Sequence, residues 1–151
     1  MNRIAATYVY PLDGHAPIRN GFVEYRPDGT VTAVGTSPDI AAESCFFDGA
    51  VVPGFVNTHC HAELSFMRGL FRRGTGMAGF IDQINALRDT CSREERIASI
   101  RHWMDVMWHR GVTAMADISN GPDSFAVKQA SPMYTRTSLK FSARNRRIAR
   151  T

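Results

Sequence analysis

The chain has 151 residues, about the length of one ordinary domain, and it is 44% hydrophobic and 21% charged, a composition that excludes the disordered class. No apolar run approaches the roughly 18 residues that a membrane helix needs, and the N-terminal residues lack the features of a secretion signal. The three cysteines are widely spaced and odd in number, which makes a poor disulfide framework and suits a reducing compartment. We therefore expect a soluble, cytoplasmic globular protein with no membrane partner.

The net charge of +4 is unevenly distributed along the chain. Residues 1–123 hold 11 Lys and Arg against 14 Asp and Glu, a balance of −3, whereas residues 124–151 hold 7 Lys and Arg and no acid, a balance of +7. The basic character therefore belongs to the C-terminal segment. Because no aromatic side chains are interleaved with its charges, we expect no nucleic-acid partner for the protein as a whole.

The first 50 or so residues read as a small antiparallel sheet. Residues 3–10 are rich in β-branched and aromatic side chains, which favour a strand. Residues 21–26 and 30–35 flank the sequence "PDG" and are typical of a hairpin. Two further short strands are expected at residues 44–47 and 50–52.

The pattern changes after residue 53, where strands begin to alternate with longer helical segments. Ser92 and Glu95 have the spacing of a capping box and mark the start of the longest helix. An order of strand, helices and strand predicts a β/α unit with a parallel sheet. In chain order, we expect a strand at 54–61, helices at 79–89 and 92–110, a strand at 112–119 and a short helix at 124–130.

Two histidines one residue apart close the strand at 54–61. Since side chains alternate between the faces of a strand, His59 and His61 should point the same way, with Asn57 below them and Cys60 on the opposite face. Two imidazoles at the carboxyl end of a parallel strand can bind one metal ion. The bland interpretation is a pair of surface histidines, but the strand context favours ligation. The other histidines are interpreted as structural or solvated; they are His15, His102 and His109.

The segment "PGFVNTHCHAELS" resembles the first barrel strand of the amidohydrolase superfamily, in the branch of cytosine/adenosine-type deaminases and chlorohydrolases. "GVTAMADIS" is similar to the second barrel strand, and the resemblance covers residues 1–132. It implies an α/β fold in which residues 1–52 form an N-terminal β-sandwich portion. Residues 53–132 would then form the first β/α units of an incomplete TIM-type barrel.

The resemblance also implies an activity. It points to metal-dependent hydrolysis of a non-peptide C–N bond in a small molecule, most simply the deamination of a nucleoside or heterocycle. An imidazolone-type ring hydrolase or a chlorohydrolase is the nearest alternative. His59 and His61 carry over as ligands of a divalent metal, zinc in the first place and iron as the alternative. The catalytic acid and base of the family have no counterpart in this chain.

Two acidic residues near the histidine pair need an interpretation. Glu63 lies in the loop that faces substrate in nucleoside-type deaminases of this branch, so substrate contact is one hypothesis. The alternative is a loop carboxylate paired with Arg68 or Arg72. Asp117 ends the second strand and could support a ligand, but we expect it to cap the loop that follows.

The chain has too few residues to form a complete barrel, which takes roughly 250 residues. Residues 133–151 read as an aberrant basic tail, and a frameshift near Ser138 or another truncation would explain it. We therefore expect an inactive fragment of a hydrolase; the alternative is a non-catalytic fragment or small binding module with a basic tail. Exposed parallel strand edges predict self-association.

Overall fold

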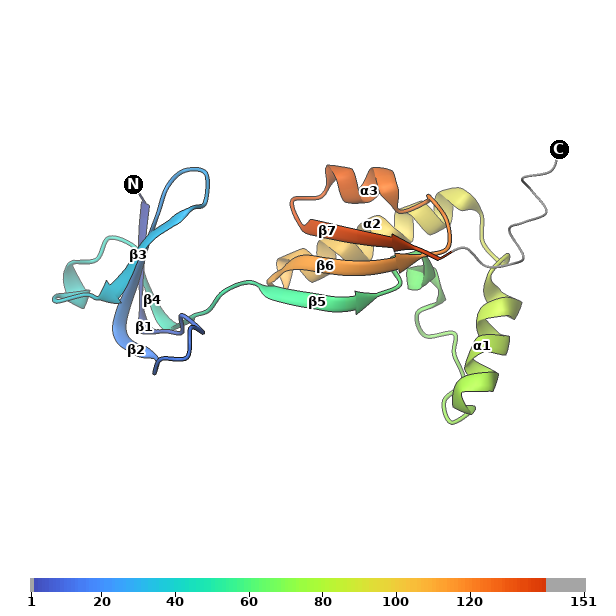
Figure 1. The fold of residues 1–151 in the computed structure, drawn as a ribbon, viewed down its shortest axis with the longest axis horizontal. Helices are drawn as coiled ribbons and strands as arrows, with labels where there is room; N and C mark the ends of the chain where they lie inside the picture. The colour runs from blue at the N-terminus through green and yellow to red at the C-terminus, as the bar shows by residue number, and fades with distance from the viewer. Residues whose placement is uncertain (1, 141–151) are drawn as a thin grey trace. The chain divides into compact units, whose positions relative to one another are not determined.

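The computed structural model describes residues 2–140, which fall into two compact units with their boundary between Pro53 and Gly54. Figure 1 traces the elements in chain order. Each unit has its own sheet, four-stranded in the first and three-stranded in the second. Within residues 2–140, no helix is long and apolar enough to cross a membrane.

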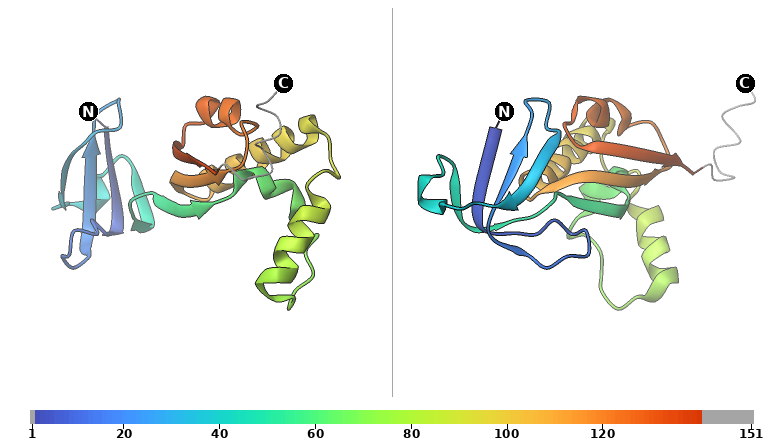
Figure 2. Two further views of the ribbon diagram at one scale, coloured as in Figure 1. Left: turned by 45° about the vertical axis from the view of Figure 1, so that its right-hand side comes forward. Right: turned by 60° about the vertical axis from the view of Figure 1, so that its left-hand side comes forward.

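The N-terminal unit is a sheet in the order β3-β2-β1-β4 (Figure 2). The predicted hairpin is confirmed: β2 and β3 pair antiparallel around the "PDG" turn, in which Gly29 has φ +86°. The prediction of two separate last strands in a purely antiparallel sheet is wrong. A single strand, β4, pairs parallel with β1, because the segment containing the short helix η1 carries the chain back to the same end of the sheet. The elements are β1 (Asn2–Val9), β2 (Ile18–Tyr25), β3 (Val31–Thr36), η1 (Ile40–Ala42) and β4 (Phe46–Val51).

The second unit is a parallel sheet in the order β5-β6-β7, with its buried core on one face. The predicted alternation of strands and helices is therefore confirmed. Gly54 precedes β5 because a Cβ at that position would lie 2.3 Å from the side chain of Thr113 on β6. The elements are β5 (Phe55–Cys60), η2 (Ala62–Met67), α1 (Gly76–Leu87), α2 (Arg93–His109), β6 (Val112–Ser119), α3 (Phe125–Ala130) and β7 (Tyr134–Leu139).

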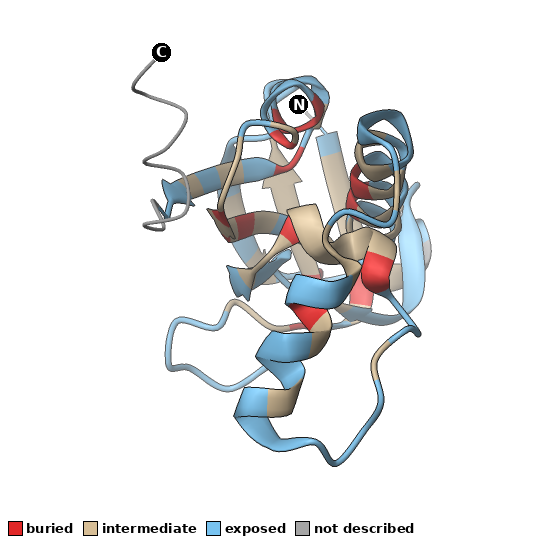
Figure 3. Cartoon of the chain, turned by 90° about the vertical axis from the view of Figure 1, so that its right-hand side faces the viewer, coloured by how far each residue is buried: buried red, intermediate tan, exposed pale blue. Residues whose placement is uncertain are grey.

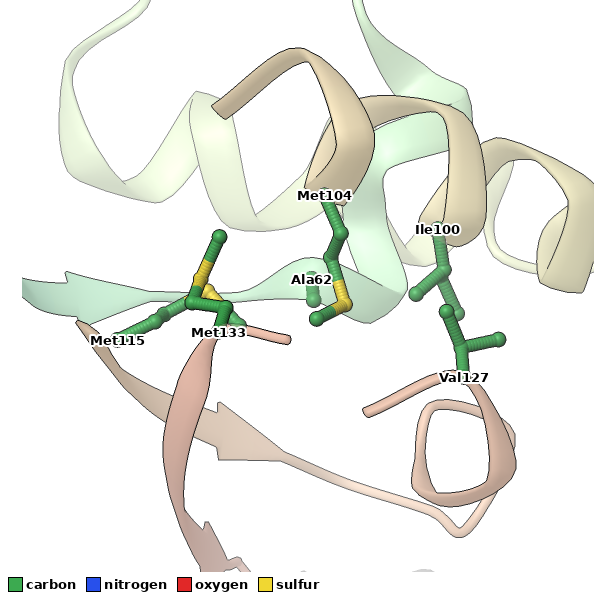
Figure 4. Packing of buried hydrophobic residues seen from close by; sticks show 6 residues of the cluster. All are labelled: Ala62, Ile100, Met104, Met115, Val127 and Met133. Carbon is green, nitrogen blue, oxygen red and sulfur yellow. The ribbon is translucent and has the colours of Figure 1, made fainter. Parts of the chain in front are cut away.

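Helix α2 is the longest element, and its two ends follow the sequence signals. The Ser92 side chain accepts from the backbone N–H of Glu95, while the Glu95 carboxylate accepts from the backbone N–H of Ser92, so the predicted capping box is present. The helix ends at His109, and Gly111, which follows the C-cap residue Arg110, has a φ of +84° that suits a residue without a Cβ. Figure 4 shows the core that α2 forms with its neighbours. Its buried members are Ala62, Ile100, Met104, Met115, Val127 and Met133.

Strand β7 corrects the prediction that residues from 133 onward form only an aberrant tail. Residues 134–139 pair in parallel with Ala114 through Ser119 of β6, residue for residue. The segment "YTRTSL" contains an aromatic and two β-branched residues, which fit a pleated strand, and its basic and polar side chains hid this signal. The rest of the predicted basic tail, residues 141–151, lies outside the described residues.

Helix α1 begins at Gly76, three residues before the predicted start, and it is largely exposed (Figure 3). Only Ile84 on this helix is buried. Phe80 and Ile81 on the same helix are 39% and 46% exposed. The sheet core therefore depends on α2 and α3 rather than on α1.

The core predicts a clear difference between two methionines. Met104 is 1% exposed within the cluster, whereas Met77 on α1 is 75% exposed. We expect Met104→Ala to lower the free energy of unfolding by about 2–5 kcal/mol, because it removes buried surface and leaves a cavity. The matched change Met77→Ala should stay within about 0.5 kcal/mol of the parent chain. Urea titration followed by circular dichroism measures both, and equal losses would contradict the described core.

Candidate metal centre

Strand β5 contains an irregularity just before its histidines. Asn57 pairs with Met115 of β6 and Cys60 pairs with Asp117, so two residues of β5 stand opposite the single residue Ala116. This two-against-one pairing is the pattern of a β-bulge, which bends a strand and re-aims its side chains. The first of the two candidate ligands, His59, therefore lies in the bulge.

The bulge corrects the expected position of Asn57. Simple alternation placed Asn57 on the face of the histidines, but its amide Nδ2 lies 3.7 Å from the sulfur of Met107, on the helix-covered face. Its Oδ1 accepts from the backbone N–H of His59 at 3.2 Å. Cys60 also packs against the core on that face, away from the histidine positions, and burial raises the pKa of its thiol.

The two imidazoles lie together at the carboxyl end of β5. Their ring centroids are 5.1 Å apart with an interplanar angle of 75°, and the His59 side chain is exposed while His61 is half-buried. The Nδ1 of His61 lies 2.9 Å from the backbone oxygen of Ile118 on β6. Because a carbonyl can only accept, Nδ1 must carry the proton, and the Nε2 lone pair of a neutral ring remains free.

A buried carboxylate fixes the backbone immediately after the pair. Asp117 is 1% exposed, and its Oδ1 accepts from the backbone N–H of Ala62 at 2.7 Å. Its Oδ2 accepts from the Ser119 hydroxyl at 2.7 Å and from the ammonium of Lys128. The expectation that Asp117 caps a loop is wrong, because the residue lies within β6 and its carboxylate reaches sideways to β5 and η2.

Lys128 completes this network from the opposite side. Its side chain is 4% exposed on α3, and its Nζ also donates to the Thr137 hydroxyl of β7 at 2.9 Å. One buried ion pair thus links β6, α3, β7 and the start of η2. Lys128 could not be recognised as buried from the sequence alone, since a single lysine on a short helix looks like an ordinary surface charge. An acidic residue in an otherwise apolar strand was the signal that a buried partner was needed.

Glu63 lies on η2, because β5 ends at Cys60 instead of continuing through the loop. Its Oε2 accepts from the backbone N–H of Asn120 at 2.8 Å, and its Oε1 accepts from the Asn120 side-chain amide. Of the two expected alternative partners, Arg68 is engaged elsewhere, because its guanidinium lies 3.8 Å from the ring centroid of Trp103.

Two shallow cavities border these residues. One of about 250 Å³ lies against η2 and α2; its lining is mostly apolar and includes His61 and Trp103. The other, of about 190 Å³, is more polar and lies beside Glu63 and Asn120. Arg88, Arg96 and Asp123 contribute charges to its wall.

The remaining histidines have other environments. His15 lies 3.2 Å from Asp13 in an exposed turn of the first unit, and hydrogen bonding to His15 lowers the pKa of the Asp13 carboxyl. His102 packs edge-on against Trp103, and the His109 ring lies 2.8 Å from a carbonyl one helical turn earlier. Within residues 2–140, no three or more His, Cys, Asp and Glu side chains group as a metal site, so the described chain offers a two-imidazole donor set.

No protein-family model and no curated protein sequence matches the chain. Solved structures do match. Aminofutalosine deaminase from Helicobacter pylori, in complex with methylthio-coformycin, superposes with a TM-score of 0.75 at 17% identity, over 96% of this chain and 38% of that one. The zinc complex of atrazine chlorohydrolase TrzN from Arthrobacter aurescens TC1 superposes with a TM-score of 0.72 at 18% identity, over 92% of this chain and 35% of that one. A zinc-bound adenosine deaminase from Xanthomonas campestris superposes with a TM-score of 0.62 at 22% identity, over 84% of this chain and 31% of that one.

The chain has the fold of part of these hydrolases. This confirms the predicted resemblance at the level of fold, and with it the fold class: an α/β chain with a small N-terminal β-portion followed by the first β/α units of a TIM-type barrel. The chain spans about a third of the length of the structures it matches. At these identities the likeness establishes the fold, and the chemistry must be argued from the residues.

The buried ion pair generates a stability prediction. Lys128→Met leaves the Asp117 carboxylate buried without its cation, so we expect a loss of about 3–5 kcal/mol in the free energy of unfolding. The exposed Lys140 provides the matched control, and Lys140→Met should change stability by less than about 0.5 kcal/mol. Adding Asp117→Asn to Lys128→Met should recover part of the loss. Urea titration measures the free energy of unfolding of all three variants. If Lys128→Met leaves that free energy unchanged, the ion pair is not formed.

Proposed function

We propose that this chain carries the first two metal ligands of an amidohydrolase-type hydrolase that acts on a non-peptide C–N bond of a small nucleoside or heterocycle. The observation that carries the proposal is the histidine pair at the carboxyl end of the first parallel strand, with the Nδ1 of His61 held by the Ile118 carbonyl. In β/α barrels this end of the strands is where reactive groups gather.

The residues present fit a divalent metal as part of its shell. A ligating histidine characteristically donates its second ring N–H to a backbone carbonyl or carboxylate, which fixes the tautomer, and His61 makes such a bond at 2.9 Å. His59 is exposed beside it with its ring 5.1 Å away. Neutral imidazoles suit zinc first and iron as the alternative. When bound, the metal would supply Lewis-acid activation of a water molecule for attack on carbon.

The similar structures support the substrate class. Two of the three matched proteins described above are deaminases, and one of them is bound to methylthio-coformycin. Two of the three contain zinc. The chlorohydrolase among them supports the broader statement, a metal-dependent hydrolase of small molecules, more directly than the narrower one.

Glu63 is proposed as a substrate contact. Asn120 donates to both carboxylate oxygens and so holds the group at the edge of the 190 Å³ cavity. A carboxylate offers about four lone-pair sites, so each oxygen keeps capacity for a further donor. Hydroxyl or amino groups of a small substrate lying in the cavity would meet that capacity.

Two histidines hold a metal weakly, because water must complete the shell. We expect the full chain to bind zinc with a dissociation constant of about micromolar or weaker, since residues 2–140 group no third His, Cys, Asp or Glu ligand with the pair. His59→Ala and His61→Ala should each abolish the binding. Isothermal titration calorimetry on the purified chain and both variants measures this, and we expect no turnover of deaminase substrates by the chain alone.

Two controls separate this site from adventitious binding. Cys60→Ser should leave zinc binding unchanged because the thiol packs into the core, and His102→Ala should leave it unchanged because that ring packs against Trp103. Tight binding that disappears with Cys60→Ser would contradict the proposed ligand pair.

Self-association is proposed from the open edges of the second sheet. Within the described residues, β5 and β7 each pair with β6 alone, so one edge of each strand is unpaired. Unpaired strand edges recruit other chains. Light scattering after size exclusion should therefore show a mass that rises with concentration. A monomeric mass across the whole concentration range would contradict this proposal.

A further inference from the structure

The strand register places a basic residue in the same cross-strand row as the histidine bulge. Ala116 of β6 stands opposite the bulge on one side and pairs with Arg136 of β7 on the other. In a parallel sheet, residues in one row project to the same face. The row therefore runs from the bulge, which contains Thr58 and His59, across the methyl group of Ala116 to Arg136.

The burial pattern shows which face this row occupies. On β6, the residues either side of Ala116, Met115 and Asp117, are buried against the helices, and Ala116 itself is only half-buried. Arg136 is exposed, whereas the next residue, Thr137, contacts Lys128 on the helix-covered face. Arg136 thus lies on the open face of the sheet, opposite to the core.

Within the described residues, the open face of the sheet has no carboxylate paired with the Arg136 guanidinium. The Arg136 side chain makes no hydrogen bond or ion pair with residues 2–140. The neighbouring positions on this face carry apolar, hydroxyl or imidazole groups rather than carboxylates, as the register shows for Val56, Ala114, Ile118, Tyr134 and Ser138. Parallel sheets are normally apolar on both faces, so an exposed guanidinium on this face is unusual, and its fork is available to an anionic ligand.

The distance suits a small ligand that spans the row. Two interstrand spacings separate the backbones of β5 and β7, which is roughly 10 Å. No long side chain of β6 stands between, because Ala116 has only a methyl group. A molecule held at the histidine pair by one end could therefore place its other end beside the guanidinium, whose planar fork matches a carboxylate.

We propose that Arg136 is a substrate-binding residue of the histidine site, and that the substrate class is a small molecule with a carboxylate or comparable anionic oxygen remote from the reacting carbon. The inference rests on the proposed function, since it takes the histidine pair as the other end of the ligand. The inference narrows that function, because it requires the substrate to carry a negative charge, which the histidine pair alone does not require.

The test compares two probes of the same shape on the zinc-loaded full chain. Terephthalate carries carboxylates at both ends of a benzene ring, and 4-carbamoylbenzoate replaces one of them with a neutral amide. After the statistical correction for its two equivalent ends, terephthalate should bind about three to five times more tightly, the range for an exposed ion pair. The preference should shrink as salt is added. Chemical-shift titration of the ¹⁵N-labelled chain gives both dissociation constants.

Two variants that each remove one positive charge test whether Arg136 causes the preference for terephthalate. Arg136→Gln should remove it, while Arg101→Gln, which deletes an exposed arginine on α2, should keep it. If both probes bind the parent chain equally, or if Arg136→Gln keeps the preference, the role of Arg136 is overturned while the metal pair stands. If zinc does not promote binding of either probe, the proposed function fails and the inference fails with it. Thermal melts of the variants confirm that each remains folded.

Discussion

The carboxylate of Asp117 on β6 ties together the start of η2, which lies 55 residues earlier in the sequence, and helix α3. It accepts the backbone N–H of Ala62, the hydroxyl of Ser119 and the ammonium of Lys128, all in the interior of the second unit. The first of these bonds fixes the chain directly after the histidine pair, and the carbonyl of Ile118, the next residue of the same strand, receives the His61 ring. The position of the candidate metal ligands therefore depends on β6 at least as much as on β5.

A buried ion pair is a costly way to hold a fold, because the loss of hydration opposes the attraction between the charges. Here the charges are also hydrogen-bonded to neighbours: the carboxylate has three donors, and the ammonium reaches Thr137 as well. A pair of apolar side chains could fill the same space but could not hold the Ala62 N–H. We infer that the network is kept for position: it sets where η2 starts and, through it, where His61 and Glu63 lie.

Local signals in the sequence predicted the elements that local chemistry controls. The capping box at Ser92, the turn at Gly29 and the strand at residues 112–119 all appear where the residues indicate them. The parallel pairing of β4 with β1 was not predictable, because strand direction depends on the path of the connecting segment. Strand β7 was missed because its polar and basic residues concealed a β-branched pattern that becomes stable only beside β6.

In the candidate site, too, features set by the local sequence could be predicted and features set by long-range pairing could not. The spacing of His59 and His61 was sufficient to predict the pair. The bulge that turns Asn57 toward Met107 depends on pairing with β6, which strict alternation cannot foresee. The partner of Glu63 was also out of reach, since Asn120 is 57 residues away and meets it only when the parallel strands align. Buried Lys128 became recognisable only with its partner Asp117.

The central claim is that His61 is held by its Nδ1 so that its Nε2 can bind a metal. Long-range ¹H–¹⁵N correlation spectra of the imidazole nitrogens, recorded on the full chain with and without zinc, test it most directly. The account predicts that His61 is protonated at Nδ1 in the absence of metal, that zinc shifts the Nε2 resonances of His61 and also moves those of His59, and that the Nδ1 proton remains. A His61 ring protonated at Nε2, or zinc shifts confined to His102 or His109, would contradict it.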